Sequence, residues 1–535
     1  MSRTFPAVSA YARRAYGASG LWDGRLLDSY LDESADVSPD GLAVVDGAAR
    51  LTYAQLRDHV ERIATGLRGL GVGPRDVVSM QLPNWWEALA THLAVLRIGA
   101  VSNPAMPILR DGDLAPVLER GGCCVLVAAA EFRGYDHGAL ALRMAKQVPT
   151  LEHVVVVRGE RPGALSFADL CASADDGGPT PGRTADDPVV LLYTSGTESR
   201  PKGAVHSHNT LGYENRSMID LYAMTTDDVV WAPSPVAHIT GVLFAIHLST
   251  MLAAPVVLQD IWDPAAGLRL IAAERCSVVV AATPFLHGIT YAPELASTDV
   301  SSLRVFVCGG ADVPPDLIRD AQDRLGVPAM RLYGSTEIPT VTSSPHTAPL
   351  SLRAGTDGRP IADDEVRVVD DTGAPVAVGE PGRLLARGPE AMLGYLDVDP
   401  QPFDEQGWFD TGDRARLSPD GYVTLVGRTK DIILRGGENI SAKEVEDLLY
   451  GHPGIADVAV VAVPDQRLTE KACAVVVARP GATVDLPSIT AYLDGLAVAR
   501  QKYPERIHLV EELPRTPTGK VQKFALRALI ADRAT

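Results

Sequence analysis

A loop of hydroxyl side chains, glycine and lysine is the sharpest chemical signal in the sequence. The segment YTSGTESRPKG (193–203) follows an apolar run directly. Free backbone N–H groups, Ser/Thr hydroxyls and a lysine cation are groups that bind polyphosphates. The Walker spacing G-x4-G-K-[ST] is absent, so the segment is not a P-loop. By itself it is equally compatible with a solvated Ser/Thr turn.

Four further segments carry residue types that serve nucleotide chemistry. They are CGGADVPP (308–315), YGSTEIP (333–339), GWFDTGDRARLSPDGYVTLVGRTKDIILRGGENIS (407–441) and LPRTPTGKVQK (513–523). Together with the first loop, and in the same order, they resemble the acyl-adenylate-forming superfamily of acyl-CoA synthetases, aryl-acid ligases, peptide-synthetase adenylation domains and firefly luciferase. The resemblance runs from about Leu51 to Lys523. It implies an acid–thiol ligase that adenylates a carboxylic acid and then forms a thioester.

The resemblance implies an ATP site that draws on most of these segments. Asp413 would accept both ribose hydroxyls, a task for a two-oxygen acceptor, and Arg428 would add a donor. The glycines of CGGA would let the backbone approach adenine closely. Glu337, with Thr197, would hold Mg²⁺, because carboxylate oxygens suit a cation that bridges phosphates. The residues implied for ATP are Thr194, Ser195, Gly196, Thr197, Lys202, Gly309, Gly310, Ala311, Tyr333, Gly334, Ser335, Thr336, Asp413, Arg428 and Lys520.

Lys520, in PRTPTGK, matches the catalytic lysine of the family. Attack of a carboxylate on the α-phosphate brings two anions together, so a cation that bridges them stabilises charge in the transition state. A compact ammonium suits this role better than a guanidinium. The resemblance therefore implies Lys520, Glu337 and Lys202 as catalytic residues.

In the family, the C-terminal domain rotates between adenylation and thioester formation. Lys430, after GRT, matches the hinge position, where few residues absorb the rotation. Gly436, Gly437 and Glu438 would then line the approach of the CoA thiol. All of these residues lie within the long segment 407–441.

Two positions depart from the family pattern. Glu198 and Ser199 replace the usual Thr and Gly of the phosphate loop, so a carboxylate would oppose phosphate binding and a position free to adopt positive φ is lost. Asp357 stands where a small apolar residue is usual. The sequence does not say whether Asp357 affects the base or the acyl site.

The acyl pocket implied by the resemblance centres on APSPVAHITG (232–241). This segment contains no carboxylate, which disfavours an amino acid substrate, and Ile239 stands where dihydroxybenzoate ligases often have Asn. We therefore expect an apolar pocket for a short or medium aliphatic, alicyclic or simple aromatic acid. The residues implied for the pocket are Trp231, His238, Ile239, Thr240, Gly241 and Gly310.

Three alternatives stay open. An aryl-acid ligase that loads a separate carrier protein is one, because the N-terminal stretch 5–27 is reminiscent of such enzymes. A nucleotide-binding regulatory protein, weakened by Glu198 and Ser199, is another. A luciferase-type oxygenase is the third, although the terminal DRAT is no peroxisomal signal.

The scaffold is expected to be α/β. Leu56, Val60, Ile63, Leu67 and Leu70 recur at helical spacing and predict an amphipathic helix that ends at Gly71. Short β-branched runs alternate with such helices, as parallel sheets covered on both faces require. The expected strands lie within 76–82, 123–129, 153–157, 189–195, 277–284 and 303–310, with a helix over 85–97.

The sequence pattern changes after about residue 345. Turn signals such as DDTGAPV, GEPGR and SPDGY predict hairpins in a smaller β-rich subdomain. After 427–437 comes an α+β unit, in which Ser441 and Glu444 predict a capping box at a helix start. We therefore expect a large N-terminal domain (1–429) of stacked, mostly parallel β-sheets with helices plus the β-rich subdomain, and a small mobile α+β C-terminal domain (430–535).

The amino-acid composition indicates which binding partners and which cell compartment to expect. The chain has 535 residues, 46% of them hydrophobic, and a net charge of −18, which disfavours nucleic acid. Six irregularly spaced cysteines and no signal peptide indicate the cytoplasm. The uncharged stretch 229–259 is interrupted by Pro and His, so buried strands and a helix are expected, not a membrane span. Expected partners are a carboxylic acid, ATP, and CoA or a carrier protein; the oligomeric state is open, with a dimer as one option.

Overall fold

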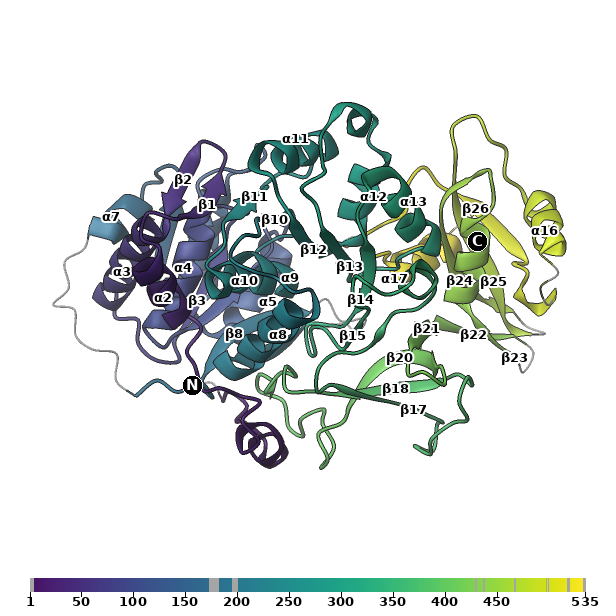
Figure 1. Ribbon diagram of the computed structural model, residues 1–535, viewed down its shortest axis with the longest axis horizontal. Coiled ribbons are helices and arrows are strands. Elements are labelled where there is room, and N and C mark those ends of the chain that lie inside the picture. The colour runs from purple at the N-terminus through teal and green to yellow at the C-terminus, as the bar shows by residue number, and fades with distance from the viewer. Residues whose placement is uncertain are drawn as a thin grey trace.

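The computed structural model describes residues 4–172, 182–194, 201–428, 431–435, 438–465, 468–496, 498, 500–516 and 520–532. Two large sheets and a smaller antiparallel sheet build most of the molecule, and a further sheet formed by C-terminal residues lies at one end of it (Figure 1). This is the α/β architecture that the sequence predicts.

A nine-stranded sheet forms the centre of the molecule. Its strands β14, β13, β12, β10, β11 and β1 are parallel neighbours, and antiparallel strands flank them at both edges. In spatial order the strands are β16 (Arg359–Pro360), β15 (Thr342–Ser343), β14 (Ala329–Tyr333), β13 (Val305–Gly309), β12 (Val278–Ala282), β10 (Val230–Ala232), β11 (Val256–Leu258), β1 (Leu42–Asp46) and β2 (Ala49–Thr52).

An eight-stranded sheet packs beside it. Its strands from β8 to β7 are parallel, whereas β9 and β19 pair in antiparallel fashion at one edge. In spatial order the strands are β19 (Gly394–Tyr395), β9 (Lys202–Ser207), β8 (Pro188–Thr194), β4 (Val101–Pro104), β3 (Val77–Gln81), β5 (Cys123–Ala129), β6 (His153–Val157) and β7 (Leu165–Ser166).

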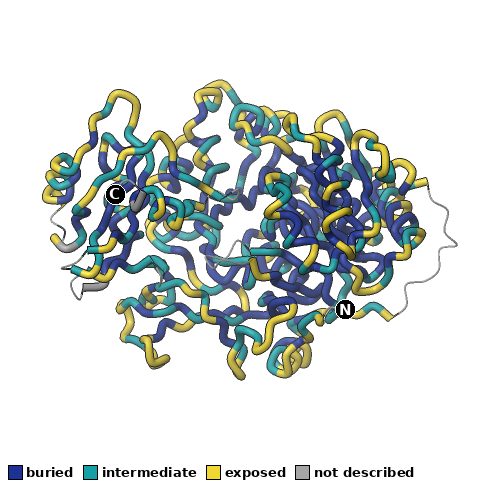
Figure 2. Tube along the Cα trace, turned by 180° about the vertical axis from the view of Figure 1, so that it is seen from behind, coloured by how far each residue is buried: buried dark blue, intermediate teal, exposed yellow. Residues whose placement is uncertain are grey.

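The largest core lies between these two sheets. Alternate residues of each central strand face opposite cores: Val278 and Val280 belong to the core between the sheets, and Val279 belongs to the outer core. Figure 2 shows the buried segments concentrated in this large domain. The helices and helical turns before the β-rich subdomain are α1 (Ala10–Ala12), η1 (Arg13–Gly17), α2 (Ser29–Val37), α3 (Tyr53–Gly69), α4 (Trp86–Arg97), α5 (Asp111–Gly121), α6 (His137–Gln147), α7 (Phe167–Ala172), α8 (His208–Leu221), α9 (Ile239–Gly241), η2 (Val242–His247), α10 (Leu248–Leu252), α11 (Pro264–Glu274), α12 (Thr283–Tyr291), η3 (Pro293–Ser297), α13 (Pro315–Leu325) and α14 (Leu350–Gly355).

Local signals explain where individual helices start. The amphipathic helix predicted after residue 51 is α3, and Thr52 and Gln55 form a capping box at its N-terminus. The uncharged stretch 229–259 forms β10, three short helices and β11, as expected. Within the described ranges, no helix has both the length and the apolar character needed to cross a bilayer.

The β-rich subdomain is a four-stranded antiparallel sheet, as the turn signals predict. Gly373, Gly379 and Gly421 adopt positive φ at its predicted turns, a conformation that glycine adopts without steric cost. Its strands in order are β17 (Glu365–Val369), β18 (Gly382–Arg387), β20 (Phe409–Leu417) and β21 (Val423–Arg428).

The C-terminal residues form a five-stranded sheet with helices. Ser441 caps α15 by accepting the Glu444 N–H, but the predicted capping box is incomplete, because the Glu444 carboxylate binds Lys502 instead. The predicted boundary at 429/430 falls on residues outside the described ones and stays a prediction. The elements are β22 (Ile432–Arg435), β23 (Glu438–Ser441), α15 (Ala442–Tyr450), β24 (Ile455–Asp465), β25 (Thr469–Ala478), α16 (Leu486–Gly495), η5 (Arg500–Lys502), β26 (Arg506–Leu509) and α17 (Lys523–Asp532).

Asp357, which departs from the family pattern, joins the nine-stranded sheet to the β-rich sheet. Its Oδ1 lies 3.2 Å from Arg331 Nη2 on β14, and both side chains are less than a tenth exposed. Its Oδ2 accepts the Leu425 N–H of β21 at 2.8 Å. The carboxylate therefore fixes β21 against the end of β14, which is a structural role.

We expect Asp357→Asn to lower the free energy of unfolding of the N-terminal domain by about 3 kcal/mol, because Arg331 is left buried without a counter-charge. The asparagine keeps an oxygen for the Leu425 N–H. Thermal unfolding followed by circular dichroism measures the effect. The double variant Arg331→Met/Asp357→Asn removes the stranded charge and should recover most of the loss; a double variant less stable than Asp357→Asn would contradict this account.

Candidate active site

The predicted site residues of the N-terminal domain lie at the carboxyl ends of parallel strands. β10 leads into the segment that contains His238, β13 ends at Gly309, and β14 ends at Tyr333. In open α/β sheets, ligands bind outside the carboxyl ends of the strands. The topology therefore brings three separate predicted segments together at the carboxyl ends of the strands of the nine-stranded sheet.

Asp413 is held between two partners that the sequence places in the same site. The Tyr333 hydroxyl donates to Asp413 Oδ2 at 2.7 Å, and Arg428 Nε lies 3.2 Å from Oδ1. Asp413 and Arg428 are register partners on β20 and β21. Burial and the Asp413 charge raise the pKa of Tyr333, so its hydroxyl stays a donor. The Tyr333–Asp413 hydrogen bond was not predicted, although both residues were.

The segment after β14 is held by close backbone contacts. A Cβ on Gly334 would lie 1.8 Å from the Pro339 carbonyl oxygen, so only glycine fits there. The Ser335 N–H donates to Ile338 O at 2.9 Å. His206 Nε2 donates to Thr336 O at 2.7 Å. These contacts fix the backbone of this segment.

Tyr395 orients the Glu337 carboxylate, and this residue was missed in the sequence. Its hydroxyl donates to Glu337 Oε1 at 2.8 Å, and the neighbouring Met392 N–H donates to Glu337 O at 2.8 Å. Tyr395 lies on β19, which pairs with β9 and so also contacts the strand that starts at Lys202. Lys202 Nζ lies 5.5 Å from the centre of the Tyr395 ring. A lone aromatic residue outside every motif gives no sequence signal for such a contact.

The phosphate-loop segment is described only at its two ends. Thr194 and Lys202 face each other as the last register pair of β8 and β9, and Thr194 Oγ1 donates to Lys202 O at 3.4 Å. Ser195, Gly196, Thr197, Glu198 and Ser199 lie outside the described residues. The structure thus shows that the antiparallel strands β8 and β9 precede and follow these residues in the sequence.

His238 begins the short helix α9 within the predicted acyl segment. Its Nδ1 accepts the Thr240 N–H at 3.3 Å, and a Cβ on Gly241 would lie 2.1 Å from Pro235 O. Burial and the Lys520 cation lower the pKa of His238 to about 4. The imidazole is therefore neutral near pH 7 and lies within electrostatic reach of Lys520.

Trp231 does not join this group. Alternation along β10 sends Val230 and Ala232 into the core between the sheets but Trp231 into the outer core. There its ring packs on Trp262 and against Gly267 of α11. We therefore leave Trp231 out of the proposed acyl pocket.

Lys520 reaches the site from the C-terminal part of the chain. Its N–H donates to Thr516 Oγ1 at 3.0 Å, and its side chain keeps contact with solvent. Burial among surrounding atoms and the Arg428 charge lower its pKa, and Asp413 and Glu337 oppose that shift. The Lys520 ammonium is thus within electrostatic range of the two predicted carboxylates.

The structure gives few contacts for the remaining predicted residues. Gly310 adopts a φ of +75° directly after β13, and the Ala311 carbonyl oxygen accepts the Thr283 hydroxyl at 3.5 Å. Lys430, Gly436 and Gly437 lie outside the described residues. Glu438 starts β23.

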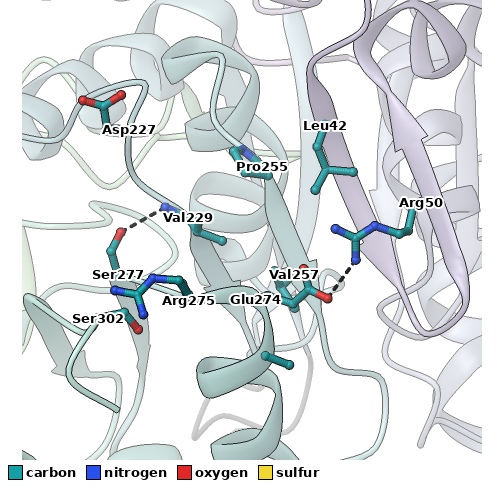
Figure 3. A pocket seen from close by; sticks show the side chains of 11 residues that line it. Leu42, Arg50, Asp227, Val229, Pro255, Val257, Glu274, Arg275, Ser277 and Ser302 are labelled. Carbon is teal, nitrogen blue, oxygen red and sulfur yellow. Dashed lines mark hydrogen bonds and ion pairs between the residues drawn. The ribbon is translucent and has the colours of Figure 1, made fainter. Parts of the chain in front are cut away.

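A different pocket lies at the other end of the strands of the nine-stranded sheet. It has a volume of about 560 Å³ and contains none of the predicted site residues. Figure 3 shows Val229, Pro255 and Ser277 around it; these three residues precede β10, β11 and β12. The pocket therefore lies at the amino ends of the strands, away from the site.

A metal ion bound at this site would need ligands that the described side chains do not supply. Among the described residues, no group of three or more His, Cys, Asp and Glu side chains could hold a metal. Glu337 is partly accessible, and Tyr395 occupies one of its oxygens. Magnesium in nucleotide enzymes is held by one or two carboxylates together with substrate phosphates, and Glu337 fits that pattern.

Two family models match the chain. The model described as AMP-binding enzyme matches residues 31–396, and the model described as AMP-binding enzyme C-terminal domain matches residues 444–520. The first of these covers more than half of the chain.

Individual relatives match along nearly the whole length. A medium-chain fatty-acid–CoA ligase of Escherichia coli is 38% identical, over 98% of this chain and 94% of the relative. A salicyl-AMP ligase/salicyl-S-ArCP synthetase of Mycobacterium tuberculosis is 34% identical, over 98% and 93%. The ATP-bound MatB structure from Rhodopseudomonas palustris superposes with a TM-score of 0.86 at 29% identity, over 95% and 100%. The chain therefore belongs to the AMP-binding enzyme family of acyl-adenylate-forming ligases.

Proposed function

We propose that the protein uses ATP to activate a hydrophobic carboxylic acid as an acyl adenylate and then transfers the acyl group to the thiol of CoA. One observation carries the first half-reaction. The Lys520 ammonium lies within electrostatic reach of Asp413, Glu337 and His238, so it joins the nucleotide end of the site to the acyl end.

In the proposed adenylation step, an oxygen of the acid attacks the α-phosphorus of ATP. The bond from the α-phosphorus to the oxygen that bridges to the β-phosphate breaks, and pyrophosphate leaves. Both reactants are anions, so Lys520 would stabilise the negative charge that gathers on the phosphoryl oxygens. Lys202 would contact the departing pyrophosphate from the phosphate-loop side.

The nucleotide would be held by groups whose donors and acceptors match it. Asp413 accepts a hydrogen bond from Tyr333 and forms an ion pair with Arg428, and its carboxylate keeps further lone pairs for the ribose hydroxyls. The open turn at Gly310, where φ is +75° and nothing lies near the Cβ position, leaves backbone free to face adenine.

Mg²⁺ would bind with the triphosphate and neutralise part of its charge. Glu337 is the described residue that would hold it, with one carboxylate oxygen fixed by Tyr395. Thr197 was assigned to the same ion by resemblance and lies outside the described residues. Its contribution stays a prediction.

The acyl pocket would be apolar. Its first segment runs through Ile239, which is buried, and carries no carboxylate that would pair with an amine. His238 is neutral near pH 7, so it adds no charge opposite the acid chain. These features favour a medium aliphatic, alicyclic or simple aromatic acid, and the relative from E. coli acts on medium-chain fatty acids by its name.

The acceptor separates this proposal from its main alternative. The relative from M. tuberculosis carries a carrier-protein activity in its name, and the chain resembles it almost as closely as the fatty-acid ligase. We propose CoA as the acceptor. Gly436, Gly437 and Glu438 would line its approach, and Lys430 would be the hinge between domains 1–429 and 430–535.

The compartment is inferred from sulfur chemistry. All six cysteines are unpaired, and four of them are buried. Unpaired cysteines persist in reducing compartments. We therefore infer that the protein works in the cytoplasm.

We expect ATP-dependent pyrophosphate release with aliphatic acids of medium length and with simple aromatic acids, followed by CoA thioester formation. A panel of acids, each offered with CoA and with a phosphopantetheinylated carrier protein, measures both half-reactions. Turnover with the carrier alone would favour the aryl-acid alternative. Normal ATP binding without pyrophosphate release for any acid would favour a regulatory protein.

Lys520→Ala should reduce adenylation by about 10²-fold, the scale of removing one partner that stabilises transition-state charge. The same variant should still convert supplied acyl adenylate into thioester, because that step forms no bond to phosphorus. Lys502→Ala is the matched control, since Lys502 pairs with the half-exposed Glu444 and has no ion pair with a predicted site residue among the described residues. Equal loss of both half-reactions in Lys520→Ala would remove Lys520 from its proposed role.

The pH profile of adenylation should follow the lowered pKa of Lys520. The ammonium is the active form and is lost as pH rises, so kcat/KM should fall at a pH below the usual lysine range. Lys520→Arg should move this fall to higher pH. His238, with a pKa of about 4, should contribute no change between about pH 6 and 8. A transition near pH 6.5 that disappears in His238→Gln would contradict this assignment.

A further inference from the structure

An ion pair links the C-terminal sheet domain to the turn at the end of β13. Lys443, near the start of α15, contacts Asp312 Oδ1, and its Nζ also lies 3.1 Å from Asp447 Oδ1 in its own helix. The side chains of Lys443 and Asp312 are 15% and 34% exposed. The Lys443 ammonium is therefore mostly buried, whereas the Asp312 carboxylate stays in contact with water, so salt screens the pair in part.

Asp312 belongs to the proposed nucleotide turn. It follows Gly310 and Ala311 directly, so its backbone is continuous with the turn proposed to face adenine. The Lys443 ammonium lowers the pKa of Asp312 in spite of its burial, which keeps the carboxylate ionised. The contact therefore joins α15 to the nucleotide site by opposite charges.

The same rigid unit carries Lys520. The helix α15 packs on β24 in one hydrophobic core, and the opposite face of β24 packs on Leu513 and Val521, which flank the lysine. Arg515, in the hairpin of Lys520, also binds Asp457 of β24 at 2.6 Å. A contact that fixes α15 therefore also fixes where Lys520 lies.

The start of α15 has a second contact with the N-terminal domain. The Ser441 hydroxyl donates to the Val426 carbonyl oxygen of β21. A Cβ on Gly427 would lie 3.6 Å from the Lys443 Cβ, so the segments that contain Gly427 and Lys443 run close together here. The Lys443–Asp312 ion pair thus lies at a surface where the two parts already meet.

We propose that Lys443 is a positioning residue, whose ion pair with Asp312 holds the C-terminal domain in the orientation that places Lys520 at the adenylation site. This inference rests on the proposed adenylation function. It assigns the orientation of the domain to one charge pair, in addition to the packing at Ser441.

A distance measurement tests the proposal without any substrate. Spin labels on cysteines introduced at Val37 and Leu509, which are 83% and 52% exposed, report the separation of the two domains once the half-buried Cys124 and Cys171 are replaced by alanine. We expect Lys443→Met to reduce the ratio of docked to undocked molecules about tenfold, as loss of a partly buried charge pair predicts. Lys443→Arg should keep the original distribution. An unchanged distribution in Lys443→Met overturns the proposal, whatever the catalytic result.

Adenylation kinetics supply the second readout. Lys443→Met and Asp312→Asn should each lower kcat for pyrophosphate release about tenfold, and the double variant should be no worse than either, because both break one pair. In a Lys520→Ala background, Lys443→Met should have no further effect. An additive double variant, or a full further loss without Lys520, would show a merely structural role and overturn the proposal.

Asp447→Asn is the matched control. Asp447 contacts the same ammonium but lies in α15 itself, so its loss leaves the pair between domains intact. Burial and the nearby Asp312 raise the pKa of Asp447 to about 6, so its charge also opposes that of Asp312. Asp447→Asn should leave both the distance distribution and adenylation unchanged. Absence of pyrophosphate release in the unsubstituted protein would sink the proposed function, while the spin-label result would still decide the ion pair.

Discussion

The direction of the parallel strands is the constraint on which the site depends. Because β10, β13 and β14 run the same way, their carboxyl ends deliver three distant segments to one edge of the nine-stranded sheet. The buried Arg331–Asp357 ion pair then sets β21 against β14. Only with both in place does the Tyr333 hydroxyl meet Asp413, since these residues belong to different sheets.

The remaining component comes from outside this scaffold. Lys520 follows the last strand of the C-terminal sheet, and its neighbours Leu513 and Val521 pack in a separate core, so no strand of the N-terminal domain determines its position. Its place beside Asp413 and Glu337 depends on contacts between domains, of which Ser441 with Val426 and Lys443 with Asp312 are the described examples. Because the proposed catalytic cation and the nucleotide scaffold lie in separate domains, the contact surface between the domains can control the chemistry of the site.

Local patterns predicted the elements, whereas contacts between distant segments could not be predicted. Helical spacing gave α3, and turn glycines gave the β-rich sheet, because both signals act over a few residues. The Lys443–Asp312 pair spans 131 residues, and the Tyr395–Glu337 bond spans 58, so no spacing reveals them. Trp231 is a different case. The run Val229 to Ala232 is apolar throughout, so the sequence does not show which face of β10 Trp231 takes, and only the structure places it in the outer core.

The charges of the site explain why it needs its ligand. The chain carries a net charge of −18, yet two cations of the site, Arg428 and Lys520, lie near enough to repel each other. The Arg428 charge lowers the pKa of Lys520. Asp413 and Glu337 offset part of this repulsion, and the phosphates of ATP would offset the rest. A nucleotide would therefore strengthen the hold on the Lys520 proton at the moment when its charge is needed, so binding and catalysis share one electrostatic cause.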